Sequence, residues 1–214
     1  MKGLEIGGPS GFFRNELPVY KEIDACDNVN FARHTIWGDV TDEYVIDGNR
    51  MGTQYIIEAT DLHEITTLYD FVLSSNVIEH IANPLKAVRE WLNVLKPGGV
   101  IVIVAPKKES NFDHRREITD FSHLIRDFEN NIPETDLTHL DEILELHDLP
   151  LDPPAGTIEQ FKARSLRNIE NRCLHHHVFD LALLTKIFDY FGITPLWDIT
   201  TEREYCSIGR KFSY

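Results

Sequence analysis

The sequence predicts an α/β fold with a doubly wound, mostly parallel sheet. Short apolar runs typical of buried strands alternate with segments in which apolar residues recur at helical spacing. The first run leads into a glycine-rich turn at residues 7–11, and an open parallel sheet binds its ligands beyond such strand ends. With 214 residues, the chain is long enough for one such domain with a full core. We therefore expect a single domain over residues 1–214.

The first half of the chain gives these elements in order. A short helix after the turn is stopped by Pro18, which cannot continue a helix. The polar, aperiodic stretch 28–53 indicates a long loop with room for one hairpin. Lys96-Pro-Gly-Gly99 stops a helix whose apolar residues recur at helical spacing. The expected strands are 2–6, 19–27, 54–62, 69–76 and 100–105, and the expected helices are 12–17 and 85–95.

The turn Glu5-Ile-Gly-Gly-Pro-Ser-Gly11 has a composition suited to a particular ligand. Its glycines allow positive φ and close approach of the backbone to a bound molecule. A carboxylate within the turn would repel a pyrophosphate, which disfavours a dinucleotide-dependent oxidoreductase. It suits a ligand that carries an ammonium group or ribose hydroxyls.

Three stretches together resemble the class I S-adenosylmethionine-dependent methyltransferases. Leu4-Glu-Ile-Gly-Gly-Pro-Ser-Gly11 resembles motif I of that family, with Pro9 in place of its middle glycine. The run from Tyr69-Asp-Phe-Val to Glu79-His80 is similar to the fourth-strand motif, and Lys96-Pro-Gly-Gly99 before an apolar strand is characteristic of the family. The resemblance covers about residues 2–106 and resumes near 178. It implies a Rossmann-like sheet of seven strands and S-adenosyl-L-methionine as cofactor.

The resemblance also implies which residues hold this cofactor. In the family an acidic residue at the end of the second strand binds the ribose, because a carboxylate accepts two hydrogen bonds from a diol. Asp24 and Asp27 both suit that role, and Asp27 is preferred; a surface aspartate in a turn is the alternative. The segment after the third strand meets the adenine. The expected cofactor contacts are Glu5, Gly7, Gly8, Pro9, Ser10, Gly11, Asp27, Glu58, Ala59, Thr60, Ser75 and Asn76.

Residues 107–177 form an insert that is too long for a simple strand-to-helix connection. Helix-like runs at 121–130, 137–147 and 157–173 are separated by the loop Asp152-Pro-Pro-Ala-Gly156. In the resembled fold, insertions at this point cover the methyl-transfer site, so we expect an α-helical lid that binds substrate. Asp180 then caps a helix over 181–191, and strands at 193–200 and 204–211 form the closing antiparallel pair.

Methyl transfer to a hydroxyl needs a general base, and histidine titrates near neutral pH. The candidate catalytic residues are His80, which follows the fourth strand, His114 and Asp113. Asp113 would orient His114, and an aspartate is the alternative to a histidine as general base. Each histidine has an alternative as a packed or solvated side chain. The expected substrate-binding residues are Arg115, Arg116, His123, His175, His176 and His177. Some sugar and catechol methyltransferases use a divalent ion, but no compact ligand motif is present here, so we expect no metal.

Composition bounds the acceptor. A net charge of −14 argues against a broad nucleic-acid surface, and no apolar run approaches a membrane span. Three scattered cysteines favour reduced thiols and a cytoplasmic setting.

The insert looks like those of methyltransferases encoded with or fused to glycosyltransferases. We therefore expect O-methylation of a sugar, by a domain of a longer protein with a glycosyltransferase partner. The faces of Phe112, Phe121, Phe161 and Phe179 would suit the sugar. A small-molecule O- or N-methyltransferase and an inactive donor-binding scaffold remain alternatives.

Overall fold

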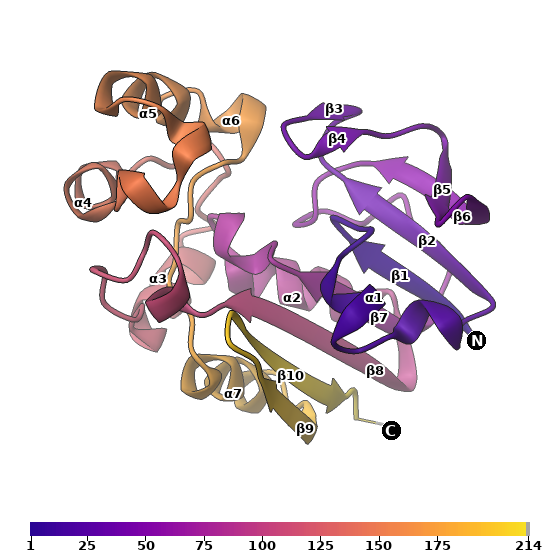
Figure 1. Cartoon of the computed structure of the whole chain (residues 1–214). Coiled ribbons are helices and arrows are strands. Elements are labelled where there is room, and N and C mark those ends of the chain that lie inside the picture. Colours follow the sequence, from indigo (N-terminus) through magenta and orange to yellow (C-terminus); the bar gives the residue numbers. More distant parts are fainter. Residues whose placement is uncertain (213–214) are drawn as a thin grey trace.

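The computed structural model describes residues 1–212 (Figure 1). Its centre is an eight-stranded sheet in the order β5-β6-β2-β1-β7-β8-β10-β9. The five strands β6, β2, β1, β7 and β8 are parallel, and β10 runs antiparallel between β8 and β9. This confirms the doubly wound sheet and its closing hairpin. The strands are β1 (Lys2–Ile6), β2 (Ala25–Asn30), β5 (Glu43–Ile46), β6 (Asn49–Ile56), β7 (Tyr69–Ser75), β8 (Leu95–Pro106), β9 (Thr194–Thr200) and β10 (Glu204–Arg210).

The eighth strand, β5, comes from the stretch that the sequence treated as a loop. It pairs antiparallel with β6 through a turn at Asp47 and Gly48, which both have positive φ. Asp-Gly is a strong hairpin signal, because both residues tolerate the positive φ that the favoured two-residue turns need. A second hairpin, β3 (His34–Thr35) with β4 (Gly38–Asp39), lies in the same stretch. The stretch therefore holds two hairpins where the sequence suggested room for one.

Two apolar clusters cover the two faces of the sheet. One contains buried residues of α2 (Pro84–Asn93), α3 (Phe121–Glu129) and α7 (Leu181–Tyr190). The other contains residues of α1 (Phe12–Asn15) together with β5. Asp180 accepts a hydrogen bond from Leu183 N at 2.7 Å, which confirms it as the N-cap of α7. Short 3₁₀ turns complete this half: η1 (Val19–Lys21), η2 (Ile78–His80) and η3 (Lys108–Ser110).

The insert folds largely into helices, as the sequence predicted. Beyond α3 it holds α4, α5 and α6, and the single helix expected over 157–173 is two helices that part near Leu166. Figure 1 shows α4–α6 grouped beyond the ends toward which β1 and β2 point, opposite the β3–β4 hairpin. These helices have a small apolar core of their own that includes Ile143 and Phe161. The bounds are α4 (Leu140–Leu146), η4 (Leu149–Leu151), η5 (Pro153–Ala155), α5 (Ile158–Ser165) and α6 (Asn168–Asn171).

All three cysteines are buried and free. Within residues 1–212, no helix is both long enough and apolar enough to cross a membrane.

Candidate functional site

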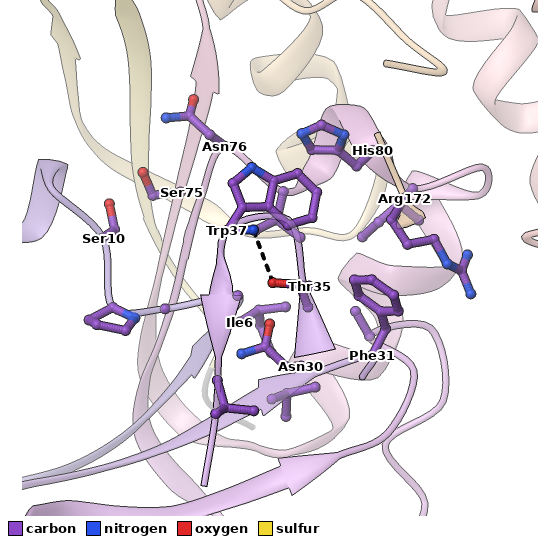
Figure 2. Close-up of a pocket in the computed structure, with 18 of the residues that line it drawn as sticks. Ile6, Ser10, Asn30, Phe31, Thr35, Trp37, Ser75, Asn76, His80 and Arg172 are labelled. Carbon is purple, nitrogen blue, oxygen red and sulfur yellow. Dashed lines mark hydrogen bonds between the residues drawn. The ribbon is translucent and has the colours of Figure 1, made fainter. Parts of the chain in front are cut away.

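A cavity of about 480 Å³ lies at the carboxyl ends of β1, β2, β6 and β7 (Figure 2). Its volume falls in the range of small-molecule and cofactor sites. Part of the wall comes from the glycine-rich turn and part from the β3–β4 hairpin, while the insert contributes two side chains. Apart from the turn itself, the wall includes Asn30, Phe31, Thr35, Trp37, Asp39, Glu58, Ala59, Thr60, Ser75, Asn76, Val77, His80, Glu134 and Arg172.

The turn is built so that only glycine fits at two positions. Gly7 has φ of +78°, and a Cβ there would lie 2.6 Å from a methyl carbon of Val77. A Cβ on Gly8 would lie 2.2 Å from the carboxyl carbon of Glu5. Gly11 differs, because a Cβ there would meet nothing within 4 Å and would extend into open space. All five predicted turn residues line the cavity: Gly7, Gly8, Pro9, Ser10 and Gly11.

Glu5 does not reach the cavity. Its carboxylate is fully buried behind the turn and accepts hydrogen bonds from the hydroxyls of Tyr20 and Tyr44 at 2.6–2.9 Å. Burial raises the pKa of Glu5 to about 7, although the two tyrosine hydrogen bonds pull it down. The expected cofactor contact is therefore replaced by a structural one, in which Glu5 supports the turn from behind.

The raised pKa of Glu5 makes folding stability depend on pH. In the folded state Glu5 binds its proton up to about pH 7, against 4.5 ordinarily, so its stabilising contribution is full below 4.5 and is lost as the pH rises through 7. The unfolding free energy of Glu5→Gln minus that of the wild type should be about 3 kcal/mol larger above pH 7 than below pH 4.5. Chemical denaturation on both sides of the window measures this difference.

A matched control is Glu22→Gln, since Glu22 is an exposed carboxylate of the same region. The unfolding free energy of this control should change with pH as that of the wild type does. Glu79 is also buried with a pKa raised to about 7, but it is present in all three proteins and cancels. The prediction would be contradicted if the unfolding free energies of the wild type and Glu5→Gln changed with pH in parallel.

Asp27, the predicted ribose ligand, lies away from the cavity. Because β2 runs to Asn30, Asp27 sits inside the strand, where Lys2 Nζ lies 2.7 Å from its carboxylate and Tyr69 donates to it at 2.8 Å. The strand therefore ends later than the sequence indicated. Asn30 stands at its carboxyl end and lines the cavity, and its amide can both donate to and accept from a diol.

Glu58, Ala59 and Thr60 line the cavity as predicted, as do Ser75 and Asn76. The Glu58 carboxylate is engaged by Arg172, whose Nη2 lies 2.6 Å away. The other terminal nitrogen of Arg172 lies 2.7 Å from Glu134. Arg172 and Glu134 both belong to the insert, so the contact of Arg172 with Glu58 fastens the insert to the carboxyl edge of the sheet.

Trp37 is a cavity residue that the sequence reasoning missed. It is at the tip of the β3–β4 hairpin, where Thr35 Oγ1 accepts a hydrogen bond from Trp37 N at 3.2 Å (Figure 2). The indole is 59% exposed although it lines the cavity, and it packs edge-to-face on His80 with ring centres 5.3 Å apart. The available signal was the apolar pair Ile36-Trp37 within a polar loop.

His80 lines the cavity and has a defined tautomer. Its Nδ1 lies 3.1 Å from the carbonyl oxygen of Leu174. A carbonyl only accepts, so Nδ1 carries the proton and Nε2 keeps its lone pair. Burial, followed by the charge of His175, holds the pKa of His80 well below its usual range. The Glu79 carboxylate lies 3.9 Å from His80 Nε2.

Asp113 orients a different histidine from the one predicted. It accepts a hydrogen bond from His175 Nδ1 at 2.5 Å, and the His175 ring packs edge-to-face on His80 at 4.6 Å. His114 faces outward and pairs with Asp148 at 2.8 Å. Asp113 is buried and His114 exposed, so the two neighbours point apart. Burial would raise the pKa of Asp113, but the charges of His175 and Arg116 lower it to about 2.

The two arginines expected to hold an acceptor are engaged elsewhere. Arg116 is buried and donates to Asp113, Glu142 and the carbonyls of His175 and His176 at 2.8–3.1 Å. Arg115 is exposed and pairs with Asp148 at 3.0 Å.

None of the six predicted substrate residues lines the cavity. His176 is buried against Asn168, while His123 and His177 belong to a separate cluster. The phenylalanine faces expected to meet a sugar are also occupied: Phe112 packs between the rings of His147 and His175, Phe121 packs on Tyr190, and Phe161 and Phe179 are buried.

A model of the methyltransferase-domain family matches residues 1–192. Among solved structures, the N-methyltransferase NodS from Bradyrhizobium japonicum WM9 aligns with a TM-score of 0.51 and 11% identity, covering 99% of this chain and 86% of NodS. NodS in complex with S-adenosyl-L-homocysteine gives the same TM-score and identity, covering 99% of this chain and 78% of that one. No curated protein matches the chain.

Two further neighbours share the fold. An O-methyltransferase family protein from Burkholderia thailandensis gives a TM-score of 0.51 at 9% identity, covering 99% of this chain and 51% of that one. The CurJ carbon methyltransferase gives 0.50 at 13% identity, covering 100% of this chain and 49% of that one. The structural similarity establishes the fold. Because the sequence identities are this low, it does not identify the acceptor atom.

Proposed function

The chain belongs to the methyltransferase-domain family, and on that premise we propose that it transfers a methyl group to a sugar hydroxyl with His80 as general base. Its methyl donor is S-adenosyl-L-methionine, which supplies an electrophilic methyl on a sulfonium. The observation that carries the proposal is the unprotonated Nε2 of a histidine in the wall of the cavity.

The cavity residues fit this donor. The backbone of the turn 7–11 approaches it closely, and Gly11 leaves room that any side chain would fill. Asn30 replaces the family's usual acid toward the ribose, and residues 58–60 lie where the resembled fold meets the adenine. Ser75 and Asn76 complete the wall at the end of β7. The cavity volume of about 480 Å³ accommodates a molecule of this size.

A hydroxyl acceptor requires the base that His80 provides. A neutral alcohol is a weak nucleophile, so its proton must leave as the new oxygen–carbon bond forms and the carbon–sulfur bond breaks. That proton moves to His80 Nε2, and the Leu174 carbonyl holds the ring in the required tautomer. Glu79 lies 3.9 Å from Nε2, and above its raised pKa of about 7 its carboxylate offsets the charge that forms on the imidazole. His175 packs edge-to-face on His80 and positions its ring, and Asp113 in turn holds His175 by a hydrogen bond.

Trp37 supports a sugar as the acceptor. Its indole is exposed beside His80, and an aromatic face suits the apolar side of a sugar ring while the base meets a hydroxyl. The insert, with its resemblance to those associated with glycosyltransferases, supports the same acceptor class and a glycosyltransferase as fused or associated partner.

Trp37→Ala is expected to raise the KM for the sugar acceptor by about tenfold, since a stacked aromatic contact is worth about 1.5 kcal/mol. Trp197→Ala is the matched control, because Trp197 is 70% exposed on β9 and does not line the cavity. Steady-state kinetics with varied acceptor measures the effect. If only the donor affinity falls, Trp37 covers the donor and its support for a sugar is lost.

The proposed reaction is tested by mass analysis of products over oligosaccharides, phenols and amines. A gain equal to one CH₂ on an oligosaccharide supports the proposal. A gain only on phenols or amines replaces it with a small-molecule O- or N-methyltransferase. Donor binding by calorimetry, with no transfer to any of these acceptors, favours a scaffold that binds the donor without catalysis.

A further inference from the structure

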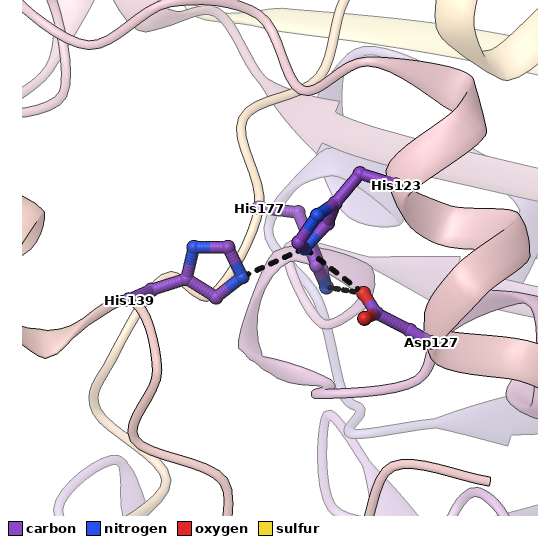
Figure 3. A group of neighbouring side chains, drawn as sticks. All are labelled: His123, Asp127, His139 and His177. Carbon is purple, nitrogen blue, oxygen red and sulfur yellow. Dashed lines mark hydrogen bonds and ion pairs between the residues drawn. The ribbon is translucent and has the colours of Figure 1, made fainter. Parts of the chain in front are cut away.

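Three histidines and one aspartate converge inside the insert, outside the donor cavity (Figure 3). We call His123, Asp127, His139 and His177 the histidine cluster. His123 and Asp127 lie one turn apart on α3, so their side chains share one face of the helix. His139 precedes α4, and His177 precedes α7. Figure 3 shows the four side chains pointing toward one another, and their potential ligand atoms all lie within 4.8 Å of one another.

The spacing of these atoms matches a tetrahedral metal site. His123 Nε2 lies 3.0 Å from His139 Nε2 and 3.2 Å from Asp127 Oδ2. His177 Nε2 lies 3.6 Å from the same Asp127 oxygen. Zinc bound tetrahedrally at 2.0–2.1 Å separates its ligands by about 3.4 Å. The three observed distances between ligand atoms, 3.0, 3.2 and 3.6 Å, lie on both sides of that value.

The polar atoms of the cluster are poorly satisfied by one another. Asp127 Oδ2 is buried and accepts no hydrogen bond of good geometry from any residue among 1–212. The two facing imidazole nitrogens of His123 and His139 are both unprotonated when they bind a metal, which removes the need for a shared proton. Buried carboxylates are normally paired or bound to metals, and imidazole is a preferred zinc ligand.

We infer that His123, Asp127, His139 and His177 bind a zinc ion that ties α3, the start of α4 and the segment before α7 to one another. Four protein ligands leave no open position, which is typical of a structural rather than a catalytic zinc. His139 Nδ1 lies 3.7 Å from the Glu142 carboxylate, and a carboxylate behind a ligating histidine is the usual outer support of zinc sites. The partly exposed rings of His123 and His139 give an ion a path from solvent.

The zinc would join three segments that are separate in the sequence. The ligands come from α3, from the residue before α4 and from the irregular segment before α7. That segment also carries His175 and His176, and His176 N donates to the Glu79 carbonyl at 2.7 Å. His177 Nε2 itself lies 3.2 Å from the carbonyl of Ala82, and zinc binding through this nitrogen would replace that contact, because a ligating nitrogen carries no proton. A zinc ion would therefore fix the segment that lies directly behind His80.

A second group, Glu79, His80 and His175, also satisfies the distance criterion for a metal. It offers three ligands, one fewer than the histidine cluster. Three separations between ligand atoms of the histidine cluster are also close to those of a tetrahedral zinc site, so we assign the zinc there. This assignment is independent of the acceptor proposed above.

The test uses full-length protein treated with a chelator, dialysed, and titrated with zinc chloride. We expect one equivalent of zinc to bind and to raise the midpoint of thermal unfolding. His139→Ala should weaken zinc binding by about 100-fold or more and abolish the thermal shift. His114→Ala is the matched control, since His114 belongs to the insert but faces Asp148 outside the cluster, and it should bind zinc like the wild type.

Two outcomes would overturn the inference: wild-type protein that binds no zinc at micromolar concentrations, or a His139→Ala variant that binds as tightly as the wild type. The second would also move the site to the Glu79 group. Circular dichroism and S-adenosyl-L-homocysteine binding show whether the variant is folded. X-ray absorption of the zinc-loaded wild type adds a direct check, with a first shell of four nitrogen and oxygen ligands expected at about 2.0–2.1 Å.

Discussion

Replacing His80 by alanine is expected to lower kcat by about 10²–10⁴-fold, the usual contribution of a positioned general base. The dissociation constant for S-adenosyl-L-methionine should change by no more than about threefold, because most residues that line the cavity belong to other elements. Single-turnover kinetics with saturating donor separates the chemical step from binding. Added imidazole should restore part of the lost rate in this variant.

His114→Ala is the matched control for this experiment. His114 was the second histidine that the sequence put forward as the base, yet it is exposed and bound to Asp148. It should keep the wild-type turnover. A His80→Ala variant with undiminished kcat would remove His80 as the base, and an equal loss of donor affinity would assign it to the donor pocket instead.

Replacing Arg116 by methionine is expected to destabilise the protein by about 3–5 kcal/mol. Arg116 is 1% exposed and its guanidinium satisfies two carboxylates and two backbone carbonyls. Methionine keeps much of the volume but leaves Asp113 and both carbonyls without this donor. For a chain of this size the midpoint of thermal unfolding should fall by about 10 °C or more, which differential scanning calorimetry measures.

The neighbouring Arg115 provides the control for this change. It is exposed and pairs with Asp148 on the surface, and surface ion pairs contribute about 1 kcal/mol or less. Arg115→Met should therefore unfold close to the wild-type temperature. Equal effects of the two substitutions would mean that the buried network of Arg116 does not hold the insert in place.

The sequence by itself determined the features that depend on short stretches of chain. The glycines of the turn and Asp180 as an N-cap act through backbone conformation and neighbouring hydrogen bonds. Strands buried on both faces and helices with one apolar face are visible in the same way. These local signals were enough to predict the fold class, the order of the elements and the turn that lines the cavity.

Local signals were weaker where a strand boundary had to be exact. Placing the end of β2 at Asp27 instead of Asn30 assigned the ribose contact to a residue inside the sheet. The local strand preferences of Asp27 and Asn30 differ too little to fix the boundary. The pairing of β2 with β1 and β6 fixes it, and that pairing depends on distant segments.

Only the tertiary structure decided which polar side chains meet. Asp113 has His114 beside it in sequence but bonds to His175, 62 positions away, because one neighbour faces the interior and the other faces water. Trp37 reaches His80 from a hairpin that no period in the sequence revealed. The spacing of His123 and Asp127 is visible in the sequence, whereas His139 and His177 join them only when the insert folds back on the core. Such contacts form because burial leaves each polar group needing a partner, and the partner is whichever group the packing of distant elements places within reach.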